Sequence, residues 1–497
     1  MKILLVYPRY PDTFWSFRHA VKVSSKKAVF PPLGLLTVGS MLPQEWDKKL
    51  IDMNVSPLTD DDVLWADYVF ISAMVIQSES VRDVIQKCKR LGIRIVAGGP
   101  LFTSEPDEYE TVDHLVLDEA EITFPLFLED LRNARPKHIY TSQERPDITK
   151  TPLPMWSLLN MKKYTAMSIQ YSRGCPFDCD FCNIAILNGR DIRTKSKNQV
   201  LAELDALYDR GWSSDVFIVD DNFIGNKRKL KEEILQGIIT WQQKRRYPFS
   251  LSTQLSINLA DDEELIQLLV TAGFDRVFIG IESPNEESLA ECNKRQNEHR
   301  DIVASVKKLQ NHGLQVQAGF ILGFDSDPIS IFKSQIKLVQ QSGIVMAMVG
   351  LLNAPRGTRL YQRMAEENRL TEEKATGDNT DCSMNFVPRM DRATLVSGYK
   401  EVLTTLYSPK QYYPRIKMFL KQYRPQRRKA MPQLKWWHLW AWVRSMWFMG
   451  ITDQGRMYYW RFVFSTLMSR PRSFPISMTL AVYGFHFWKV ARELQYT

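Results

Sequence analysis

Tyr171-Ser172-Arg173-Gly174-Cys175-Pro176-Phe177-Asp178-Cys179-Asp180-Phe181-Cys182 is the stretch around which the rest of this chain is organised. Its cysteines, Cys175, Cys179 and Cys182, are spaced C-x3-C-x2-C and have no fourth cysteine nearby. Three thiolates in one short loop are typical of iron–sulfur ligation. With only three protein ligands, one iron of a four-iron cluster keeps an open position at which it can chelate a small molecule. The pattern therefore predicts a reactive [4Fe-4S] cluster.

Two structural interpretations of the triplet are weaker. A structural zinc site needs four closed ligands, and no histidine lies between His138 and His299. A disulfide framework is typical of small secreted proteins, whereas this chain has 497 residues, six cysteines and only a short apolar run at its N-terminus. The sequence thus favours a cytoplasmic, reducing compartment, which suits an oxygen-sensitive cluster.

Charge is distributed unevenly along the chain, whose formal net charge is +9. Residues 408–497 contain sixteen Lys and Arg but only two acids, Asp453 and Glu493, so they carry +14 and the first 407 residues carry −5. The same segment holds seven of the thirteen tryptophans, most of them in the run 434–443 behind Arg427-Arg428-Lys429. Before it, an amphipathic pattern follows a plausible helix cap at Asp391. The sequence predicts a mildly acidic body with a basic, aromatic, mainly helical end.

Strand and helix patterns alternate in two regions. Apolar runs at 3–7, 68–73, 93–97 and 113–117 are typical of buried parallel strands, and the helices between them predict a doubly wound, Rossmann-like sheet. Further runs at 167–171, 216–219, 249–259, 277–281, 316–322 and 346–352 predict six βα units, a partial (β/α)6 barrel with polar residues at its carboxyl face. We expect an α/β chain with domains at 1–134 and 161–365, a linker at 135–160 and a helical domain at 366–497.

The cysteine triplet, with Phe181 before its last cysteine, resembles the motif of the radical S-adenosylmethionine (SAM) superfamily. The first region resembles the cobalamin-binding domain that precedes the SAM barrel in one class of these enzymes, through Pro31-Pro32-Leu33-Gly34-Leu35, Gly98-Gly99-Pro100 and Asp118-Glu119-Ala120-Glu121. Asp118 stands where that family usually has glycine, which leaves the backbone there open. The chain lacks D-x-H-x-x-G, so cobalamin is expected without a histidine lower ligand.

The whole chain resembles the subgroup with a basic helical C-terminal domain, which includes hopanoid C-2 methylase. The segments that carry this likeness are Phe14-Trp15-Ser16-Phe17, Pro43-Gln44-Glu45-Trp46 and Gly323-Phe324-Asp325-Ser326-Asp327.

The resemblance implies a [4Fe-4S] cluster on Cys175, Cys179 and Cys182, with SAM and cobalamin beside it. The expected SAM contacts are Phe181, Asp220, Asp221, Asn222, Gln254 and Glu282. The last two are placed for the ribose hydroxyls, while Arg190 and Arg193 could pair with the SAM carboxylate or lie on an exposed face. The expected cobalamin contacts are Tyr7, Pro32, Leu33, Gly34, Ser72, Met74, Gly98, Gly99, Pro100, Glu119 and Glu121.

The activity implied by the resemblance is methylation of an unactivated carbon. A 5′-deoxyadenosyl radical removes a hydrogen atom and methylcobalamin supplies the methyl group, so no catalytic base is expected. The expected substrate is hydrophobic, lipid-like or hopanoid-like, and a reductase, flavodoxin or ferredoxin would donate electrons. Two alternatives stay open: a related enzyme that rearranges, cyclises or oxidises its substrate, and a cobalamin or redox sensor with a nucleic-acid-binding tail.

The sequence of the C-terminal segment does not decide between contact with a membrane and packing on the rest of the protein. Residues 473–488 form a run of sixteen residues without a charged side chain, shorter than the roughly 20 residues that a spanning helix needs. We therefore expect no transmembrane helix. Peripheral contact with the inner face of the cell membrane and an ordinary helical cap are weighted equally, and nucleic-acid binding is disfavoured.

Overall fold

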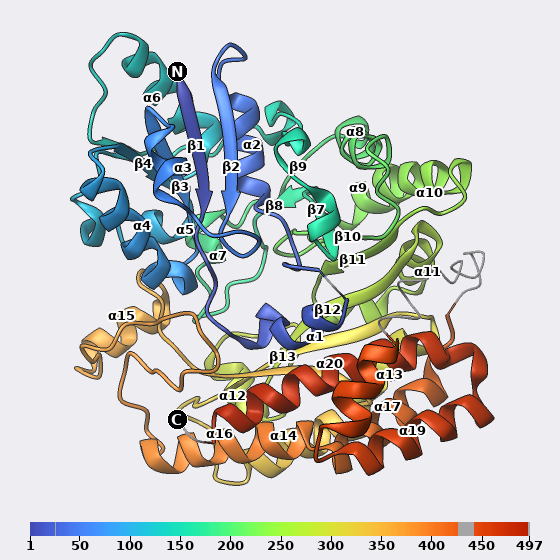
Figure 1. The fold of residues 1–497 in the computed structure, drawn as a ribbon. Helices are drawn as coiled ribbons and strands as arrows, with labels where there is room; N and C mark the ends of the chain where they lie inside the picture. Colours follow the sequence, from blue (N-terminus) through green and yellow to red (C-terminus); the bar gives the residue numbers. More distant parts are fainter. Residues whose placement is uncertain (25, 426–441, 496–497) are drawn as a thin grey trace.

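The structure, a computed structural model, describes residues 1–24, 26–425 and 442–495 (Figure 1). The basic stretch 427–429 and the tryptophan-rich run up to residue 441 lie outside the described residues. Two parallel sheets and a set of C-terminal helices make up the described chain. The predicted α/β architecture, with a Rossmann-like first part and a helical last part, is confirmed.

The first sheet has six parallel strands in the order β2-β1-β3-β4-β5-β6. Their bounds are β1 (Lys2–Tyr7), β2 (Asp47–Asp52), β3 (Tyr68–Ser72), β4 (Arg94–Gly98), β5 (His114–Val116) and β6 (Ile139–Tyr140). The helices are α1 (Arg18–Ser24), α2 (Leu33–Met41), α3 (Asp60–Leu64), α4 (Ser78–Arg90), α5 (Pro100–Ser104) and α6 (Ala120–Arg132).

Helices cover both faces of this sheet because alternate strand residues point to opposite sides. Ile3, Leu5 and Phe70 belong to a core that includes side chains of α2 and α6. Leu4 and Val6 belong to a second core with side chains of α3, α4 and α5. Helices therefore pack on both faces of the sheet, which is the doubly wound arrangement predicted from the apolar runs.

Two strands of the first sheet escaped the sequence prediction. Strand β2 reads Asp-Lys-Lys-Leu-Ile-Asp and lies at the edge of the sheet with only its last residue buried. Strand β6 has two residues and falls inside the predicted linker. Edge strands lack the continuous apolar run of a central parallel strand, so the sequence carries no clear sign of β2 or β6.

The second sheet is also six-stranded and parallel, in the order β14-β13-β12-β11-β10-β7. Sequence order across the sheet is the topology of a partial (β/α)6 barrel. The strands are β7 (Ala166–Ile169), β10 (Asp215–Ile218), β11 (Ser250–Gln254), β12 (Phe274–Glu282), β13 (Gln315–Leu322) and β14 (Met346–Leu351). A short antiparallel pair, β8 (Ser172–Arg173) and β9 (Arg193–Thr194), brackets the cysteine loop.

Helices follow the strands of this sheet. They are α7 (Ile184–Leu187), α8 (Lys197–Tyr208), α9 (Lys227–Lys229), α10 (Leu235–Lys244), α11 (Glu263–Ala272), α12 (Glu286–Glu291), α13 (Ile302–Asn311), α14 (Ile331–Ser342) and α15 (Arg359–Glu366). The run predicted as a strand over 249–259 is wrong in its second half, because the strand ends at Gln254 and a 3-10 turn covers Ile257–Asp261. Apolar residues in that turn are buried like those of a strand, which is why the pattern could not separate the two.

The C-terminal part is built from α16 (Arg392–Tyr407), α17 (Pro409–Gln422), the π-helical segment η9 (Met446–Ile451), α19 (Arg456–Ser469) and α20 (Phe474–Glu493). Asp391 caps α16, as predicted, by accepting a hydrogen bond from the Thr394 amide at 2.9 Å. On the same helix, the Tyr407 hydroxyl donates to the Ala347 carbonyl on β14 at 2.6 Å. The C-terminal helices therefore share a core with the second sheet.

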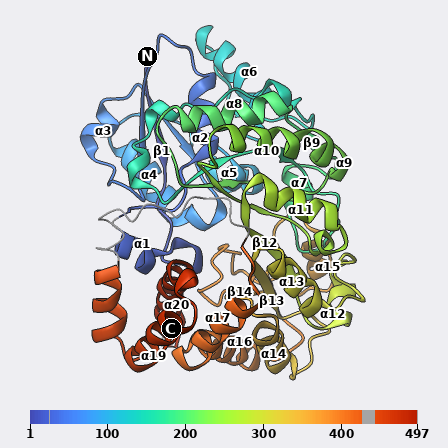
Figure 2. The ribbon, with the colours of Figure 1, turned by 90° about the vertical axis from the view of Figure 1, so that its right-hand side faces the viewer.

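The last helix also reaches back to the beginning of the chain. Helix α1 lies against α20 (Figure 2), and Phe14 stacks on Phe487 with ring centroids 4.1 Å apart. The His486 ring is hydrogen-bonded to the Phe14 carbonyl, 472 residues away in sequence. The connection that leaves β1 is thus anchored on the C-terminal helices. Among the described residues, no helix combines the length and the apolar character needed to cross a bilayer.

Candidate cofactor site between the two sheets

The cysteine loop leaves β8 and returns to β9, next to the carboxyl ends of the second sheet. Gly174 opens it with φ +97°, and a Cβ there would lie 2.6 Å from the Asp191 carbonyl oxygen, so only glycine fits. Cys175, Cys179 and Cys182 are all half-buried. In the described part of the chain, no three His, Cys, Asp or Glu side chains converge on a single metal ion. In a [4Fe-4S] cluster each thiolate binds a different iron.

A lysine that the sequence analysis missed lies beside the three thiols. Burial raises the pKa of each thiol, that of Cys182 to about 12, and the neighbouring Lys294 ammonium opposes this shift in all three. Lys294 donates to Glu282 at 2.7 Å, and both side chains are largely buried. A fixed positive charge beside the donor set favours the thiolate form that binds iron. No motif signalled Lys294, because its proximity to the loop depends on the fold.

Glu282 lies at the carboxyl end of β12, as expected for a ribose contact. It has φ +65°, and the strand register shifts between Gly280 and Glu282. A Cβ at Gly280 would collide with both Glu282 and Lys294, so this glycine makes room for the ion pair. Gln254 ends β11 and is half-buried, while Phe181 meets the edge of Phe324 at 6.3 Å between ring centroids. Glu282 and Gln254 thus end neighbouring strands and Phe181 lies on the cysteine loop, and their contact with SAM stays a prediction.

The three polar residues after β10, also predicted to contact SAM, make hydrogen bonds within the protein. Asp220 is fully buried and accepts from the Tyr171 and Ser172 amides, each at 2.8 Å. Burial outweighs these bonds and raises its pKa to about 7. Asp221 accepts from the Gly174 amide at 3.0 Å, and Asn222 is bonded to Ser256. Both aspartates thus hold the backbone that leads into the cysteine loop, and their contact with SAM stays a prediction.

The predicted cobalamin contacts outside the acidic turn lie at the carboxyl ends of β1, β3 and β4 and at the start of α2. Gly99 has φ +91°, and a Cβ there would lie 2.6 Å from the Ser72 hydroxyl. Gly34 differs, because its Cβ position has no atom within 4 Å. Met74, at the same edge, is 41% exposed. Open space beside a glycine and an exposed apolar side chain fit a bulky ligand. The remaining contacts at this edge are Tyr7, Pro32, Leu33, Gly98 and Pro100.

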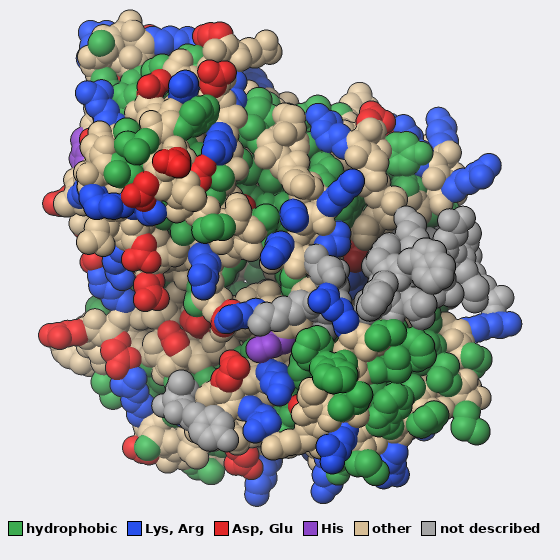
Figure 3. Space-filling model, in the orientation of Figure 1, with side chains coloured by type: hydrophobic (Ala, Val, Ile, Leu, Met, Phe, Trp, Pro, Cys, Tyr) green, Lys and Arg blue, Asp and Glu red, His purple; other side chains and the backbone are tan. Residues whose placement is uncertain are grey.

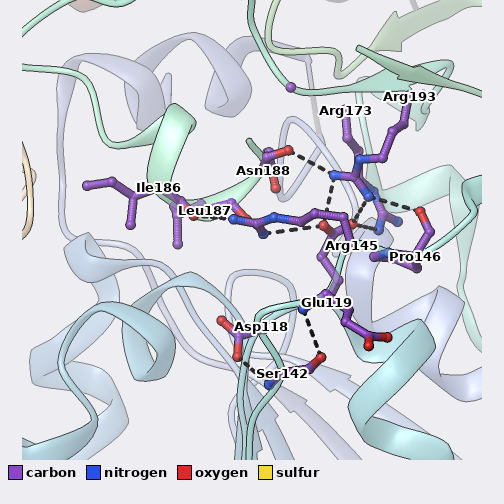
Figure 4. Close-up of polar contacts among 12 residues, drawn as sticks. Asp118, Glu119, Ser142, Arg145, Pro146, Arg173, Ile186, Leu187, Asn188 and Arg193 are labelled. Carbon is purple, nitrogen blue, oxygen red and sulfur yellow. Dashed lines mark hydrogen bonds and ion pairs between the residues drawn. The ribbon is translucent and has the colours of Figure 1, made fainter. Parts of the chain in front are cut away.

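The acidic turn before α6 faces the cysteine loop instead (Figure 4). Arg173 pairs with Glu119 at 2.6 Å and with Glu121 at 2.7 Å, and all three side chains are at most 14% exposed. Arg193, considered for the SAM carboxylate, pairs with Glu119 at 2.8 Å. Burial alone would raise the pKa of Glu121, but Arg173 outweighs it and lowers that pKa to about 2. We call these four residues the interdomain bridge.

Two neighbouring contacts complete the bridge. Arg145, in the connection between the sheets, lies 3.4 Å from Glu119 and donates to the carbonyls of Ile186 and Leu187 (Figure 4). Asp118 has φ +61°, so it keeps the left-handed backbone that a glycine would adopt. Its carboxylate accepts from the Ser142 amide at 3.0 Å. Arg190, the other arginine considered for SAM, instead pairs with Asp178 at 3.3 Å.

Three family models match successive parts of the chain. Residues 21–128 match the B12 binding domain, residues 169–334 match the Radical SAM superfamily, and residues 358–497 match a domain of unknown function, DUF4070.

Two curated relatives extend over most of the chain. An uncharacterised methyltransferase of Synechocystis sp. is 41% identical and aligns with 98% of this chain and 91% of its own length. Hopanoid C-2 methylase of Rhodopseudomonas palustris is 33% identical over 82% of this chain and 77% of its own length.

Solved structures share the fold at low identity. The cobalamin-dependent S-adenosylmethionine radical enzyme OxsB has a TM-score of 0.63 at 15% identity, covering 100% of this chain and 80% of that one. The radical S-adenosylmethionine methyltransferase TsrM from Kitasatospora setae, with cobalamin and a [4Fe-4S] cluster bound, has a TM-score of 0.60 at 14% identity, covering 93% of this chain and 99% of that one.

Proposed function

The chain belongs to the cobalamin-dependent radical SAM methyltransferase family, and from that premise we propose that it methylates an unactivated carbon of a hydrophobic, lipid-like substrate. Its cofactors are a [4Fe-4S] cluster, SAM and cobalamin. The lipid class is supported by hopanoid C-2 methylase, which aligns with most of the chain. Because the relatives that span the chain are methyltransferases, we set aside the sensor alternative.

The observation that carries the proposal is the interdomain bridge. Through Arg173, two residues before Cys175, it holds the acidic turn after β5 against the loop that would bind the cluster. Methyl transfer to a carbon radical requires that substrate and both cofactors converge in one closed space. The interdomain bridge supports this requirement, because it joins the acidic turn of the first sheet to the cysteine loop beside the second sheet.

The residues present fit the three groups. Cys175, Cys179 and Cys182 would hold the cluster, with Lys294 as the neighbouring positive charge. Glu282, with Gln254, would bind the ribose hydroxyls of SAM through charge-assisted hydrogen bonds. The open space at Gly34 and the exposed Met74 would accept the corrin. When bound, the cluster with SAM supplies radical chemistry and cobalamin supplies the methyl group.

The chain's own part is to bind, orient and exclude water. Asp220 and Asp221 fix the backbone entering the cysteine loop, and the bridge fixes the distance between the two sheets' edges. No proton transfer by a side chain is required, so no catalytic base is assigned. A lipid substrate implies that the protein works at a membrane surface, and no helix of the described chain could span the membrane. Reduction of the cluster also requires an electron donor such as a flavodoxin or ferredoxin.

The test is anaerobic reconstitution with iron, sulfide, cobalamin, SAM and a total lipid extract, followed by mass spectrometry. We expect a lipid heavier by one CH2, together with S-adenosylhomocysteine and 5′-deoxyadenosine. A product of changed structure without an added CH2 would instead support a rearrangement, cyclisation or oxidation. Cys179→Ala should abolish formation of 5′-deoxyadenosine, and any that persists would exclude the proposed cluster site.

A further inference from the structure

The C-terminal helices expose a row of large apolar side chains. On α19, Met457, Phe464 and Met468 are 69%, 58% and 87% exposed, and their spacing of seven and four residues puts them on one side of the helix. The row extends about 17 Å along the axis. Arg461, also exposed, lies on the same side, four residues after Met457. Isolated exposed apolar residues are normal, but a contiguous row marks a contact surface.

A second row lies on the neighbouring segment. Trp447 and Ile451 of η9 are 58% and 52% exposed, and Val443 precedes them by one turn at 43%. Segment η9 packs against α19, where the Trp460 indole nitrogen donates to the Gly450 carbonyl at 3.0 Å. Figure 3 shows hydrophobic side chains gathered over the C-terminal helices, with Lys and Arg side chains at the lower edge of that area. We call the two rows together the apolar face.

The charge around the apolar face is of one sign. Arg456, Arg461 and Arg472 are exposed, and within the described residues no carboxylate forms an ion pair with any of them. Of the two acids after residue 407, Asp453 is buried and Glu493 lies 3.8 Å from His19. The surface therefore presents aromatic and aliphatic side chains among arginines that form no ion pair with a carboxylate of the described residues.

We propose that the apolar face binds the surface of an anionic lipid bilayer, with Phe464, Met468 and Trp447 entering the headgroup region. Apolar residues flanked by arginines on a helix that cannot span the bilayer are the features of an interfacial helix. Each basic residue near an anionic surface adds to the attraction. A second copy of the chain fits less well, because a two-fold contact would set the same unpaired arginines against one another.

The test is flotation of the full-length protein with vesicles, without substrate. Wild type should float with an equimolar mixture of phosphatidylcholine and phosphatidylglycerol, less at high salt, and stay at the bottom with phosphatidylcholine alone. Phe464→Glu combined with Met468→Glu should lower binding about tenfold or more. Arg461→Gln should lower it roughly fivefold. The matched control is Leu64→Glu combined with Leu126→Glu, two exposed apolar residues of the first domain, which should float like wild type.

Three results would overturn the inference. One is wild type that does not float with the anionic vesicles, and another is a Phe464/Met468 variant that floats as well as the control. The third is a concentration-dependent dimer, seen by sedimentation equilibrium, that the same variant dissociates without any vesicle binding. All of these substitutions are at exposed positions, so the melting curve should stay unchanged. Since no substrate is present, a failure here is distinguishable from a failure to find a methylated lipid.

Discussion

Arg173 stands two positions before Cys175 and carries two ion pairs to the other sheet's acidic turn. Arg173→Ala should lower the free energy of unfolding by about 3 kcal/mol, because it leaves the Glu121 carboxylate buried without its partner. Urea denaturation measures the change. Arg90 is the matched control, since it is 61% exposed and pairs with Asp60; Arg90→Ala should cost less than about 1 kcal/mol. Equal losses in both variants would contradict the burial of the bridge.

Glu121 makes the bridge sensitive to acid. Its pKa is about 2 in the folded chain against an ordinary value of 4.5, because Arg173 outweighs the effect of burial. A carboxyl whose pKa is lower in the folded chain contributes stability that is fully present above the unfolded pKa and is lost as the pH falls toward the folded one. Wild type should therefore exceed Glu121→Gln in stability by up to about 3 kcal/mol at neutral pH. That difference should shrink below about pH 4.5. A difference that is constant with pH, measured by urea denaturation, would refute this assignment.

At the scale of elements, substitutions of two glycines at the carboxyl edge of the first sheet test stability and cobalamin binding separately. Gly99→Ala should destabilise the protein by about 1–3 kcal/mol, since its φ is +91° and the Ser72 hydroxyl occupies the Cβ position. Gly34→Ala should leave the melting temperature unchanged, because its Cβ position is empty, yet weaken cobalamin binding, seen as reduced corrinoid absorbance after reconstitution. Full cobalamin binding by Gly34→Ala would remove α2 from the proposed cobalamin site.

The same elements show how far the sequence predicts structure. Central strands such as β1 and β13 were predicted to within a few residues, because burial on both faces demands a continuous apolar run. Edge strand β2, with Lys48 and Lys49, lacked that signal. The acidic turn was predicted as a cobalamin contact from its position at a strand end and from its resemblance to the cobalamin-binding domain. Its turn toward Arg173 depends on a residue 52 positions away from Glu121, which no local pattern encodes.

For the whole molecule, the contact between the first and last segments is testable. Phe487 is 1% exposed and packs between Phe14 and Tyr407. Phe487→Ala should cost about 3–5 kcal/mol of unfolding free energy and, by loosening the connection after β1, should also weaken cobalamin binding. Phe464→Ala is the control from the same helical domain, because its side chain is exposed and should cost less than about 0.5 kcal/mol. Unchanged cobalamin binding in Phe487→Ala would show that the first sheet's edge does not depend on α20.

The global arrangement was predictable only in outline. Charge and tryptophan content separated a basic end from an acidic body, and two alternating regions gave the two sheets. Phe14 and Phe17 were noted as marks of a subgroup, but their partner, α20, lies more than four hundred residues further along. Lys294 was missed for the same reason. Hydrophobic periodicity indicates local secondary structure, but it does not indicate which distant segments pack together.

The interdomain bridge has a consequence for how the family could diversify. Two carboxylates of the first domain pair with a guanidinium of the second, so the lengths of these side chains contribute to the separation of the two sheet edges. A homologue with a larger ligand would need side chains of a different length at Glu119, Glu121 or Arg173. These three positions are therefore where changes linked to ligand size should first be sought.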